Sequence, residues 1–535
     1  MVSPGGKQTE PGTTGGGWRR NDWKIKQIKQ GTPATSQPER TAESSLPHRV
    51  NRNCTSVVAG GQSTRMSFET ANHRGAKGYR KIERARTYPL EDKPELMPSA
   101  SNRVTPRFSG DDLAHWAWTE PSVWTNSMLV TLEQSSVRGG KWHSLMDKVY
   151  KPDNLLSAYR EVAANKGSPG VDNVTIEDFT AALVRNVSKL EKQLQDGSYR
   201  PQSIKRVHIP KPGTKETRPL GIPTVRDRVV QNALRHVLEP ILERQFAEHS
   251  YGFRPNRGCK DALRRVDRLL KDGYKYVVDV DLKSYFDTIP HDRLLQELRK
   301  YVADNSAIGL VEKFLQAEIM DGLDRWTPSM GAPQGAIISP LLSNLYLNDL
   351  DHQMASQGYE MTRYADDLVI QCRTREEADQ ALEIVRSWTA ERGLTLHPTK
   401  TKIVHVDEEG FEFLGYRFIK HRRFPRQKSL EKFKETIRGK TRRNHGDSLQ
   451  AIIGNVNRTL CGWFEYFKHS WKTTFPALDG WVRMRLRSIL RRRRKTKGRG
   501  SQISDSRLYP NSFFAEHGLF SMTEARVREC QSARQ

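Results

Sequence analysis

The sequence predicts an α+β fold, in which one β-sheet carries helices on one face and a separate basic helical region follows. Short apolar strands and longer runs with apolar residues three and four positions apart alternate between residues 276 and 406. Their order, strand, helix, helix, hairpin, helix, strand, is that of a split β-α-β arrangement. From about Lys420 the chain is strongly basic and mostly helical. The sheet region is expected to contain elements at 276–281, 291–302, 338–354, 359–372, 374–392 and 403–406.

The composition indicates a partner with many negative charges. The 535 residues carry a formal net charge of +26, and this length leaves room for several domains. Phosphate backbones are the commonest partner of such a surface, and binding to them weakens steeply with salt. A ribosome-associated or merely adhesive basic protein is the alternative that composition leaves open.

Cysteine usage and apolar runs indicate the compartment. The five cysteines are scattered without a C-x-x-C pair, which argues against a zinc ribbon or a disulfide framework and fits a reducing compartment. No apolar run approaches the roughly 20 residues that span a bilayer, and residues 1–20 lack the apolar core of a signal peptide. We therefore expect a cytoplasmic protein with no membrane partner.

Residues 1–135 form the first expected segment. They are rich in Gly, Ser, Thr, Pro, Asn and Arg, and their few apolar residues show no period. This composition predicts a largely disordered basic extension, with short helices near Asp111–Trp118. A basic arm that touches RNA and a segment without function remain equal alternatives.

Helical and hairpin patterns begin after residue 140. Apolar residues recur at helical spacing from Leu145 to Val162, and turn residues at 165–172 end that helix. Residues 206–213 and 218–222 read as two strands joined by a tight turn. A basic hairpin of this kind can lie over phosphates. Further along, Thr374 and Glu377 form an expected capping box, and Gly393 ends the helix that they begin.

Two adjacent carboxylates mark the expected site of chemistry. Asp366 and Asp367 lie at the tip of the hairpin 359–372, and Asp281 ends the strand 276–281, with Asp279 two residues earlier on the same face. Neighbouring carboxylates repel each other unless a cation lies between them. Mg²⁺ prefers carboxylate and phosphate oxygens, and a two-metal site needs a third carboxylate from a nearby strand. An isolated Asp-Asp pair is far more often a solvated turn.

Five segments together resemble the ordered motifs of reverse transcriptases. They are Asp281–Asp287 (DLKSYFD), Gly331–Asn344 (GAPQGAIISPLLSN), Tyr364–Asp367 (YADD), Leu394–Thr401 (LTLHPTKT) and Phe413–Tyr416 (FLGY). The resemblance implies a right-hand polymerase fold that uses dNTPs and two Mg²⁺ ions held by Asp281, Asp366 and Asp367. It divides the chain into an N-terminal extension, fingers, palm, thumb and a short tail. The expected bounds are 1–135, 136–270, 271–420, 421–500 and 501–535.

The resemblance also implies roles in nucleotide binding. Lys211 and Arg218 would bind the incoming triphosphate, although surface charge is the simpler interpretation of both. Phe286 lies where the family has an aromatic steric gate against a 2′-hydroxyl, with a core aromatic as the alternative. Gln334 would line the same pocket, and Gly335 would allow close backbone approach. Lys400 is expected to hold the active-site strands or a phosphate.

A narrower resemblance is to the reverse transcriptases encoded by bacterial group II introns. Residues 165–172 (NKGSPGVD), 218–225 (RPLGIPTV) and 250–255 (SYGFRP) resemble their N-terminal motifs, and residues 457–487 resemble their maturase domain. This implies a maturase that binds its intron RNA, assists splicing and copies the RNA at a target DNA, as a possible homodimer associated with the nucleoid. RNA contacts are expected from six arginines, with a solvated charged helix as the alternative. These are Arg485, Arg487, Arg491, Arg492, Arg493 and Arg494.

Two departures and several alternatives accompany this resemblance. The paired C-x-x-C motifs of the H-N-H endonuclease found in many relatives are missing, so we expect no second-strand cleavage by this chain. The long N-terminal extension has no counterpart. A splicing cofactor with an inactive polymerase, another class of reverse transcriptase, an RNA-directed RNA polymerase and a passive RNA-binding protein are the alternatives. The three aspartates disfavour the inactive and passive proteins, and the maturase-like region disfavours retron, diversity-generating and defence enzymes.

Overall fold

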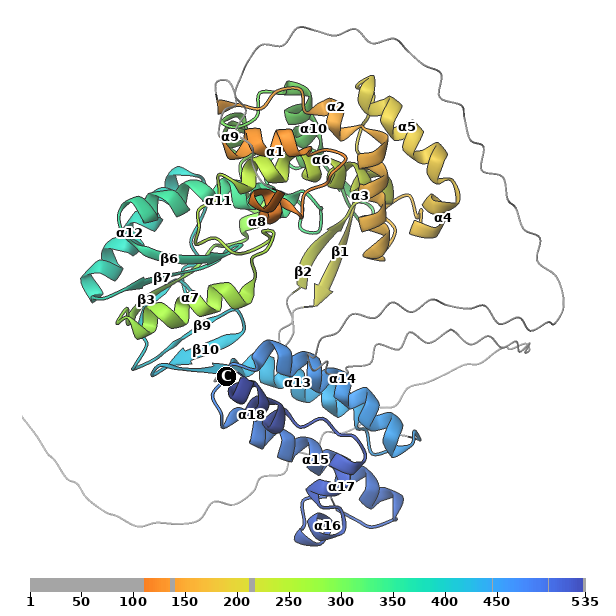
Figure 1. Ribbon diagram of the computed structural model, residues 1–535, viewed down its shortest axis with the longest axis vertical. Coiled ribbons are helices and arrows are strands. Elements are labelled where there is room, and N and C mark those ends of the chain that lie inside the picture. Colours follow the sequence, from red (N-terminus) through yellow and green to blue (C-terminus); the bar gives the residue numbers. More distant parts are fainter. Residues whose placement is uncertain (1–109, 135–139, 211–216, 445, 499, 533–535) are drawn as a thin grey trace, which may run out of the picture. The chain divides into compact units, whose positions relative to one another are not determined.

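The computed structural model describes residues 110–134, 140–210, 217–444, 446–498 and 500–532 (Figure 1). Three β-sheets and two main groups of helices make up these residues. No helix in this described part of the chain is long and apolar enough to cross a membrane.

The central sheet holds the strands expected between residues 276 and 406. Its order is β6-β7-β3-β8, and all three pairings are antiparallel. Valine and isoleucine side chains of these strands are buried on both faces, which gives β3 its nearly continuous apolar sequence. The bounds are Tyr276–Asp281 for β3, Glu360–Tyr364 for β6, Asp367–Cys372 for β7 and Lys402–His405 for β8.

Helices cover this sheet on both faces, so the expectation of helices on one face is wrong. Val278 and Ile370 belong to the larger hydrophobic core together with α11 (Ser339–Ser356) and α12 (Arg375–Glu391). Val277 and Val369 point to the opposite face. There they pack against α7 (Cys259–Lys271), which therefore belongs with the central sheet rather than with the fingers segment 136–270.

Helix α12 begins and ends close to where its sequence predicts. The Thr374 side chain accepts a hydrogen bond from the Glu377 N–H at 3.2 Å, and Gly393 has a positive φ of 74° directly after the C-cap. The Glu377 carboxylate accepts from the N–H of Arg373, at 2.8 Å, rather than from that of Thr374. One half of the expected capping box is therefore shifted by one residue.

A second, outer sheet has the order β2-β1-β4-β5. The expected hairpin forms its first half, with His208 opposite Pro219 in an antiparallel pair. Strand β4 joins β1 in parallel from a distant part of the chain, so residues 319–326 lie with the fingers hairpin although they fall within the expected palm. The bounds are Ile204–Pro210 for β1, Thr217–Ile222 for β2, Ile319–Asp321 for β4 and Asp324–Trp326 for β5.

Helices form the rest of this half of the molecule. The long helix α6 is buried along most of its length and contacts α2, α3, α4 and α5. These helices are α2 (Met146–Val149), α3 (Pro152–Ala164), α4 (Ile176–Ala181), α5 (Leu183–Gln195), α6 (Val225–Glu243), α8 (Tyr285–Thr288), α9 (His291–Arg299) and α10 (Asn305–Leu315).

The N-terminal extension ends earlier than expected. A 3₁₀ helix at Gly110–Trp116 and helix α1 (Asn126–Glu133) lie inside the expected disordered segment 1–135. Trp116 and Trp124 are 5% and 2% exposed, and the Trp124 indole donates to the carbonyl of His236 at 2.9 Å. The 3₁₀ helix confirms the short helix expected near Asp111–Trp118. The prediction of disorder is wrong for the segment that follows it up to residue 134, because a few large aromatic side chains anchor a segment without apolar periodicity. The rest of the extension lies outside the described residues.

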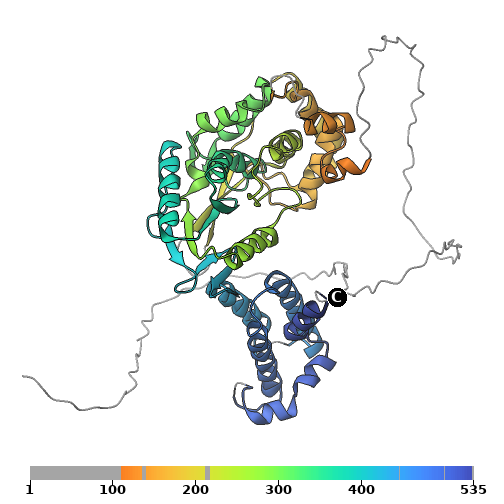
Figure 2. The ribbon, with the colours of Figure 1, turned by 60° about the vertical axis from the view of Figure 1, so that its left-hand side comes forward.

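The C-terminal bundle consists of α13 to α18 and follows a small sheet of order β11-β10-β9. Figure 2 shows its long helices, in blue, side by side. Phe514 and Met522 are fully buried in the bundle core, so most of the expected tail 501–535 is part of this domain. The bounds are β9 Phe411–Phe413, β10 Tyr416–Ile419, β11 Arg422–Pro425, α13 Gln427–Lys440, α14 Leu449–Phe467, α15 Thr474–Arg493, α16 Ile503–Leu508, α17 Asn511–Glu516 and α18 Met522–Ser532.

Candidate active site

Three aspartates meet at one end of the central sheet. Asp281 at the end of β3 is paired in register with Asp367 at the start of β7, and Asp366 lies in the turn between β6 and β7. Ala365 in that turn has a left-handed φ of 59°, which reverses the chain within two residues. All three aspartates line one cavity of about 630 Å³, together with Asp279 and Lys400.

Two carboxylates of this site have raised pKa values. Burial, followed by the charges of Asp279 and Asp366, raises the pKa of Asp367 to about 7. Burial also raises the pKa of Asp366, against the opposing charge of Arg218. Both shifts mean that the ionised forms are disfavoured without a cation nearby.

This donor set fits a hard divalent cation. The acidic side chains that line the cavity supply only oxygen ligands, the type that Mg²⁺ prefers. In the described residues no three acidic, His or Cys side chains already surround one point. Lys400 holds Asp281 in an ion pair, with Nζ 3.0 Å from Oδ2. Lys400 thus lies where the sequence predicts, and its partner is the first catalytic candidate.

A buried arginine supports the turn that carries Asp366. Arg363 is 0% exposed, and its guanidinium forms a salt bridge with Asp351 of α11. Its Nη1 donates to the carbonyl of Ala365 and to Asn344 Oδ1, both at 2.9 Å. The guanidinium therefore fixes the turn through the carbonyl of Ala365. Sequence reasoning missed this residue because surface charge is the usual role of an arginine.

The SYGFRP segment supports the same turn through its backbone. The Tyr251 N–H donates to the Arg363 carbonyl at 2.9 Å, and Asn344 Nδ2 donates to the Gly252 carbonyl at 2.7 Å. A Cβ atom on Gly252 would lie 2.3 Å from the backbone nitrogen of Ala365. Only glycine allows this close approach, which explains a motif whose role the sequence did not reveal.

The FLGY turn borders the site on the side of the small sheet. Leu414 and Gly415 have positive φ angles of 46° and 81°, and a backbone hydrogen bond from Leu414 lowers the pKa of Asp367. The Tyr466 hydroxyl of α14 donates to the Leu414 carbonyl at 2.7 Å. This turn therefore connects the aspartates to the C-terminal bundle. Further cations that line the cavity, unrecognised in the sequence, are Lys402, Arg417, Arg426 and Lys428.

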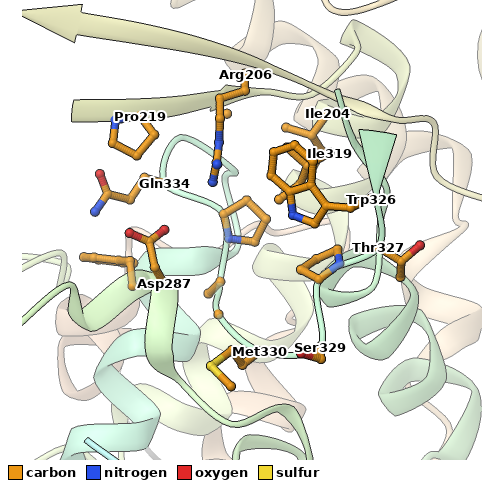
Figure 3. Close-up of a pocket in the computed structure, with 16 residues that line it drawn as sticks. Ile204, Arg206, Pro219, Asp287, Ile319, Trp326, Thr327, Ser329, Met330 and Gln334 are labelled. Carbon is orange, nitrogen blue, oxygen red and sulfur yellow. The ribbon is translucent and has the colours of Figure 1, made fainter. Parts of the chain in front are cut away.

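The expected nucleotide residues Phe286 and Gln334 line a second cavity, of about 410 Å³, below the outer sheet (Figure 3). In Figure 3 Arg206 and Asp287 extend into it from opposite sides. The Arg206 guanidinium lies over the Trp326 ring, 4.9 Å from its centroid. Arg206, Asp287 and Trp326 were not expected from the sequence.

Arg218 belongs to the hairpin above this cavity. The positive charge of Arg218 opposes the rise in pKa of both Asp287 and Asp366. Arg218 therefore acts on one carboxyl group from each of the two cavities. Lys211 lies outside the described residues.

Gly335 allows a close approach between backbones, as its sequence context predicts. It has a positive φ of 104°, and a Cβ atom there would lie 2.3 Å from the carbonyl oxygen of Gly221 in β2. The Gly221 N–H donates to the Gln334 carbonyl at 2.6 Å. The glycine thus joins the PQG loop to the outer sheet.

Comparison with known proteins identifies the family. A family model described as reverse transcriptase (RNA-dependent DNA polymerase) matches residues 209–418, and one described as group II intron, maturase-specific domain matches residues 430–506. Protein YkfC of Escherichia coli (strain K12) is 34% identical over 387 residues, which cover 64% of this chain and 95% of YkfC. The chain belongs to the group II intron reverse transcriptase–maturases.

Two further relatives are named as intron proteins. The group II intron-encoded protein LtrA of Lactococcus lactis subsp. cremoris is 37% identical over 203 residues, 38% of this chain and 33% of LtrA. The putative COX1/OXI3 intron 1 protein of Saccharomyces cerevisiae is 27% identical over 367 residues, 58% of this chain and 43% of that protein. The matching segment thus spans about a third and under half of these two relatives.

The expected function follows from the two matched domains. The α+β polymerase fold is confirmed, and the chain is a reverse transcriptase and maturase whose partner is a group II intron RNA. Reverse transcriptases generally use divalent metal ions. The maturase match also separates this reverse transcriptase–maturase from enzymes that share only the polymerase domain.

The six arginines expected to bind RNA in the maturase region have different surroundings. Arg487 is 8% exposed, and it donates to the Tyr509 carbonyl at 2.9 Å and to Asn511 Oδ1 at 3.0 Å. Its guanidinium lies over the Phe514 ring. The prediction is wrong for Arg487, because its buried guanidinium holds α15 to the helices that follow it.

Two other arginines also make contacts inside the C-terminal bundle. Arg485 donates to the Thr441 carbonyl at 2.8 Å, and Arg491 pairs with Asp505 at 2.7 Å. The side chains at 492–494 are exposed, and that of Arg493 also donates to a backbone carbonyl. Arg492, Arg493 and Arg494 are thus the exposed members of the set.

Proposed function

We propose that this reverse transcriptase–maturase polymerises DNA at the cavity formed by Asp281, Asp366 and Asp367. The observation that carries the proposal is the meeting of these three carboxylates at the ends of β3 and β7, where burial and mutual repulsion raise the pKa of Asp366 and Asp367. Such a group of acids is stable in its ionised form only with bound cations.

We infer that two Mg²⁺ ions are the cations. When bound, they would activate the primer 3′-hydroxyl and neutralise the leaving pyrophosphate. The chain itself supplies the rest. The β3–β7 pairing fixes Asp281 and Asp367, and the turn that Arg363 supports fixes Asp366. Lys400 forms an ion pair with Asp281 that a bound cation would displace.

The incoming dNTP is proposed to lie between the two cavities. Arg218, whose charge acts on Asp366 and Asp287, fits the role of a triphosphate ligand. Lys211, which lies outside the described residues, is assigned the same role on the family resemblance alone. Phe286 and Gln334 line the cavity next to the aspartates, which supports the steric gate and pocket roles. Fixed cations there would stabilise the charge that moves to pyrophosphate.

A target DNA partner, self-association as a homodimer and work at the bacterial nucleoid complete the proposal. They rest on the family and on the strong positive charge of the chain rather than on a particular contact.

Primer extension on an RNA template tests the polymerase. Wild type, Asp366→Asn and the exposed control Asp292→Asn are compared with dNTPs and Mg²⁺, and RNA binding is measured in parallel. We expect extension by wild type and Asp292→Asn, and its loss in Asp366→Asn with RNA binding retained. An RNA-binding wild type that extends no primer would reduce the function to a splicing cofactor, and extension by Asp366→Asn would refute the site.

A further inference from the structure

A third cavity, of about 700 Å³, lies near the C-terminal end of α7, among residues of α7, β11, the α14–α15 loop and α18. We call it the α7–α18 cleft. It shares no lining residue with the cavity of the three aspartates. The fourteen lining residues are Asp267, Leu270, Lys271, His421, Arg422, Arg423, His469, Ser470, Trp471, Lys472, Arg526, Val527, Cys530 and Gln531.

The cleft has a surplus of positive charge. Five of its lining residues are lysine or arginine, whereas Asp267 is the single carboxylate among these described residues. Asp267 is already engaged, because its Oδ2 lies 2.9 Å from Arg423 Nη1. The cationic side chains of Lys271, Arg422 and Lys472 are exposed. The charge of the cleft therefore exceeds what its own acid can balance.

A buried polar group gives a second, independent sign of a missing acceptor. The Nε atom of Arg526 is buried without a hydrogen-bond partner in the protein. It is a donor, and buried donors normally have acceptors. His469 reports the same field, since burial and then the charges of neighbouring cations, including Arg423 and Arg526, lower its pKa to about 4. An anion bound in this cleft would therefore balance its charge and accept a hydrogen bond from its buried donor.

The positive surface continues from the cleft along α7. Arg264, Arg268 and Lys271 are exposed at positions i, i+4 and i+7, which places them on one face of the helix. This row covers about 10 Å at the helical rise of 1.5 Å per residue. A single small anion cannot span both the row and the cleft, whereas a chain of phosphates can.

An aromatic ring lies within the same surface. The guanidinium of Arg422 stacks on Trp471, 4.3 Å from the ring centroid. The backbone N–H of Trp471 donates to the Arg423 carbonyl at 2.8 Å. Aromatic rings and arginine side chains next to a positively charged groove are typical of surfaces that bind nucleic acids. The ring belongs to the maturase-specific match 430–506, and β11 and α7 lie outside that match.

We propose that the α7–α18 cleft and the basic row of α7 bind the phosphate backbone of structured RNA, at a surface separate from the polymerase cavity. RNA is favoured over DNA because the α14–α15 loop of the cleft falls in the segment matched by the group II intron maturase model. The inference rests on the maturase assignment and does not require polymerase activity. Since α7, β11 and α18 all contribute, the surface exists only when the polymerase and maturase segments are joined.

The test uses full-length protein, a labelled RNA hairpin and a DNA hairpin of the same sequence. Excess unlabelled primer–template with a dideoxy-terminated primer occupies the polymerase cavity throughout. The variant is Lys271→Glu/Lys472→Glu, and the control with the same charge change is Arg185→Glu/Lys192→Glu on α5. All four side chains are exposed, and none of the four is part of the polymerase site.

We expect the cleft variant to bind the RNA hairpin at least tenfold more weakly, with a salt-dependence slope reduced by about two. The control variant is expected to keep the wild-type affinity, and both variants are expected to extend primers at the wild-type rate. Equal loss of affinity in the two variants, or none in the cleft variant, would overturn the proposal. Loss of extension in the cleft variant alone would place the cleft on the primer–template path and overturn its separateness.

Cys530 gives a direct readout of occupancy. It is an exposed free cysteine that lines the cleft, so bound RNA is expected to slow its alkylation by iodoacetamide in wild type and not in the cleft variant. Unchanged alkylation with saturating RNA would contradict the proposal. Equal protection by the DNA hairpin would refute the preference of the cleft for RNA over DNA. A wild type that extends no primer, yet shows the RNA results, would refute the proposed polymerase and leave the cleft supported.

Discussion

Replacement of Gly252 by alanine tests how the catalytic turn is held. The new Cβ would lie 2.3 Å from the backbone nitrogen of Ala365 and 2.9 Å from the carbonyl carbon of Tyr364. Ordinary contacts begin at 3.4 Å. The turn or the Ser250–Phe253 segment must therefore move by about 1 Å, and neither can yield by a side-chain rotation because both partners are backbone.

The expected effect on the reaction follows from this displacement. Asp366 is the residue after Ala365, so a shift of the turn moves the carboxylate with it. A misplacement of about 1 Å in an active site reduces the rate roughly 100-fold, which corresponds to about 2.7 kcal/mol of transition-state stabilisation. Overpacking of a well-packed region destabilises a protein by about 1–3 kcal/mol. We therefore expect Gly252→Ala to remain folded and to lose most of its rate.

Single-turnover primer extension with saturating primer–template and dNTP measures this rate, and thermal unfolding followed by circular dichroism measures stability. Gly309→Ala in α10 is the control, since a Cβ there meets nothing within 4 Å and alanine favours the helix. A Gly252→Ala protein with the wild-type rate and unfolding temperature would refute the claim that this glycine sets the position of the turn.

Three further predictions concern charged groups. Arg363→Met is expected to destabilise the protein by about 3–5 kcal/mol in denaturant unfolding, because it leaves the Asp351 charge buried without its partner. Adding Asp351→Leu should recover much of the lost stability. A double variant that recovers none of it would contradict this reasoning. Lys400→Met should lower the Mg²⁺ concentration for half-maximal extension by at most about fivefold, as expected for a solvent-screened pair, and an increase would refute competition between lysine and cation. The pKa of Glu161 is lowered to about 2, chiefly by its hydrogen bond with His236, so its stabilising effect is complete above the usual value of 4.5 and is lost as the pH falls toward 2. Glu161→Gln should therefore lower the unfolding temperature at pH 7 more than at pH 3, and equal effects at both values would be inconsistent with that shift.

The sequence predicts the carboxylate site because its signals are local. Strand β3, the hairpin tip and the helix cap at Thr374 each depend on residues within a few positions of one another. The register that brings Asp281 opposite Asp367 is then set by the burial of alternate valines and isoleucines. Local chemistry and strand period together suffice for this part of the site.

The supports of the site are not predictable in this way, because they join distant segments. Gly252 meets a turn more than 100 residues later, and its need for a missing side chain is visible only once the turn lies against it. The same holds for Trp124, whose anchoring hydrogen bond reaches His236. A composition typical of disorder conceals such contacts, since one buried indole can hold a segment that lacks any apolar period.

Positive charge separates into two roles that composition cannot distinguish. Arg363 and Arg487 are buried, and their guanidinium groups donate to carboxylates and carbonyls inside the protein. They therefore add to the net charge of +26 without offering a surface for RNA. The arginine run near the end of α15 is the most basic segment in the sequence, yet part of it holds the C-terminal bundle together. The α7–α18 cleft has fewer cations, but its single acid is already paired and the buried Nε of Arg526 has no acceptor. An RNA-binding surface is therefore better located by charge that the protein leaves unbalanced than by the density of basic residues, because phosphate binds where it completes hydrogen bonds and charge pairs that the fold has not made.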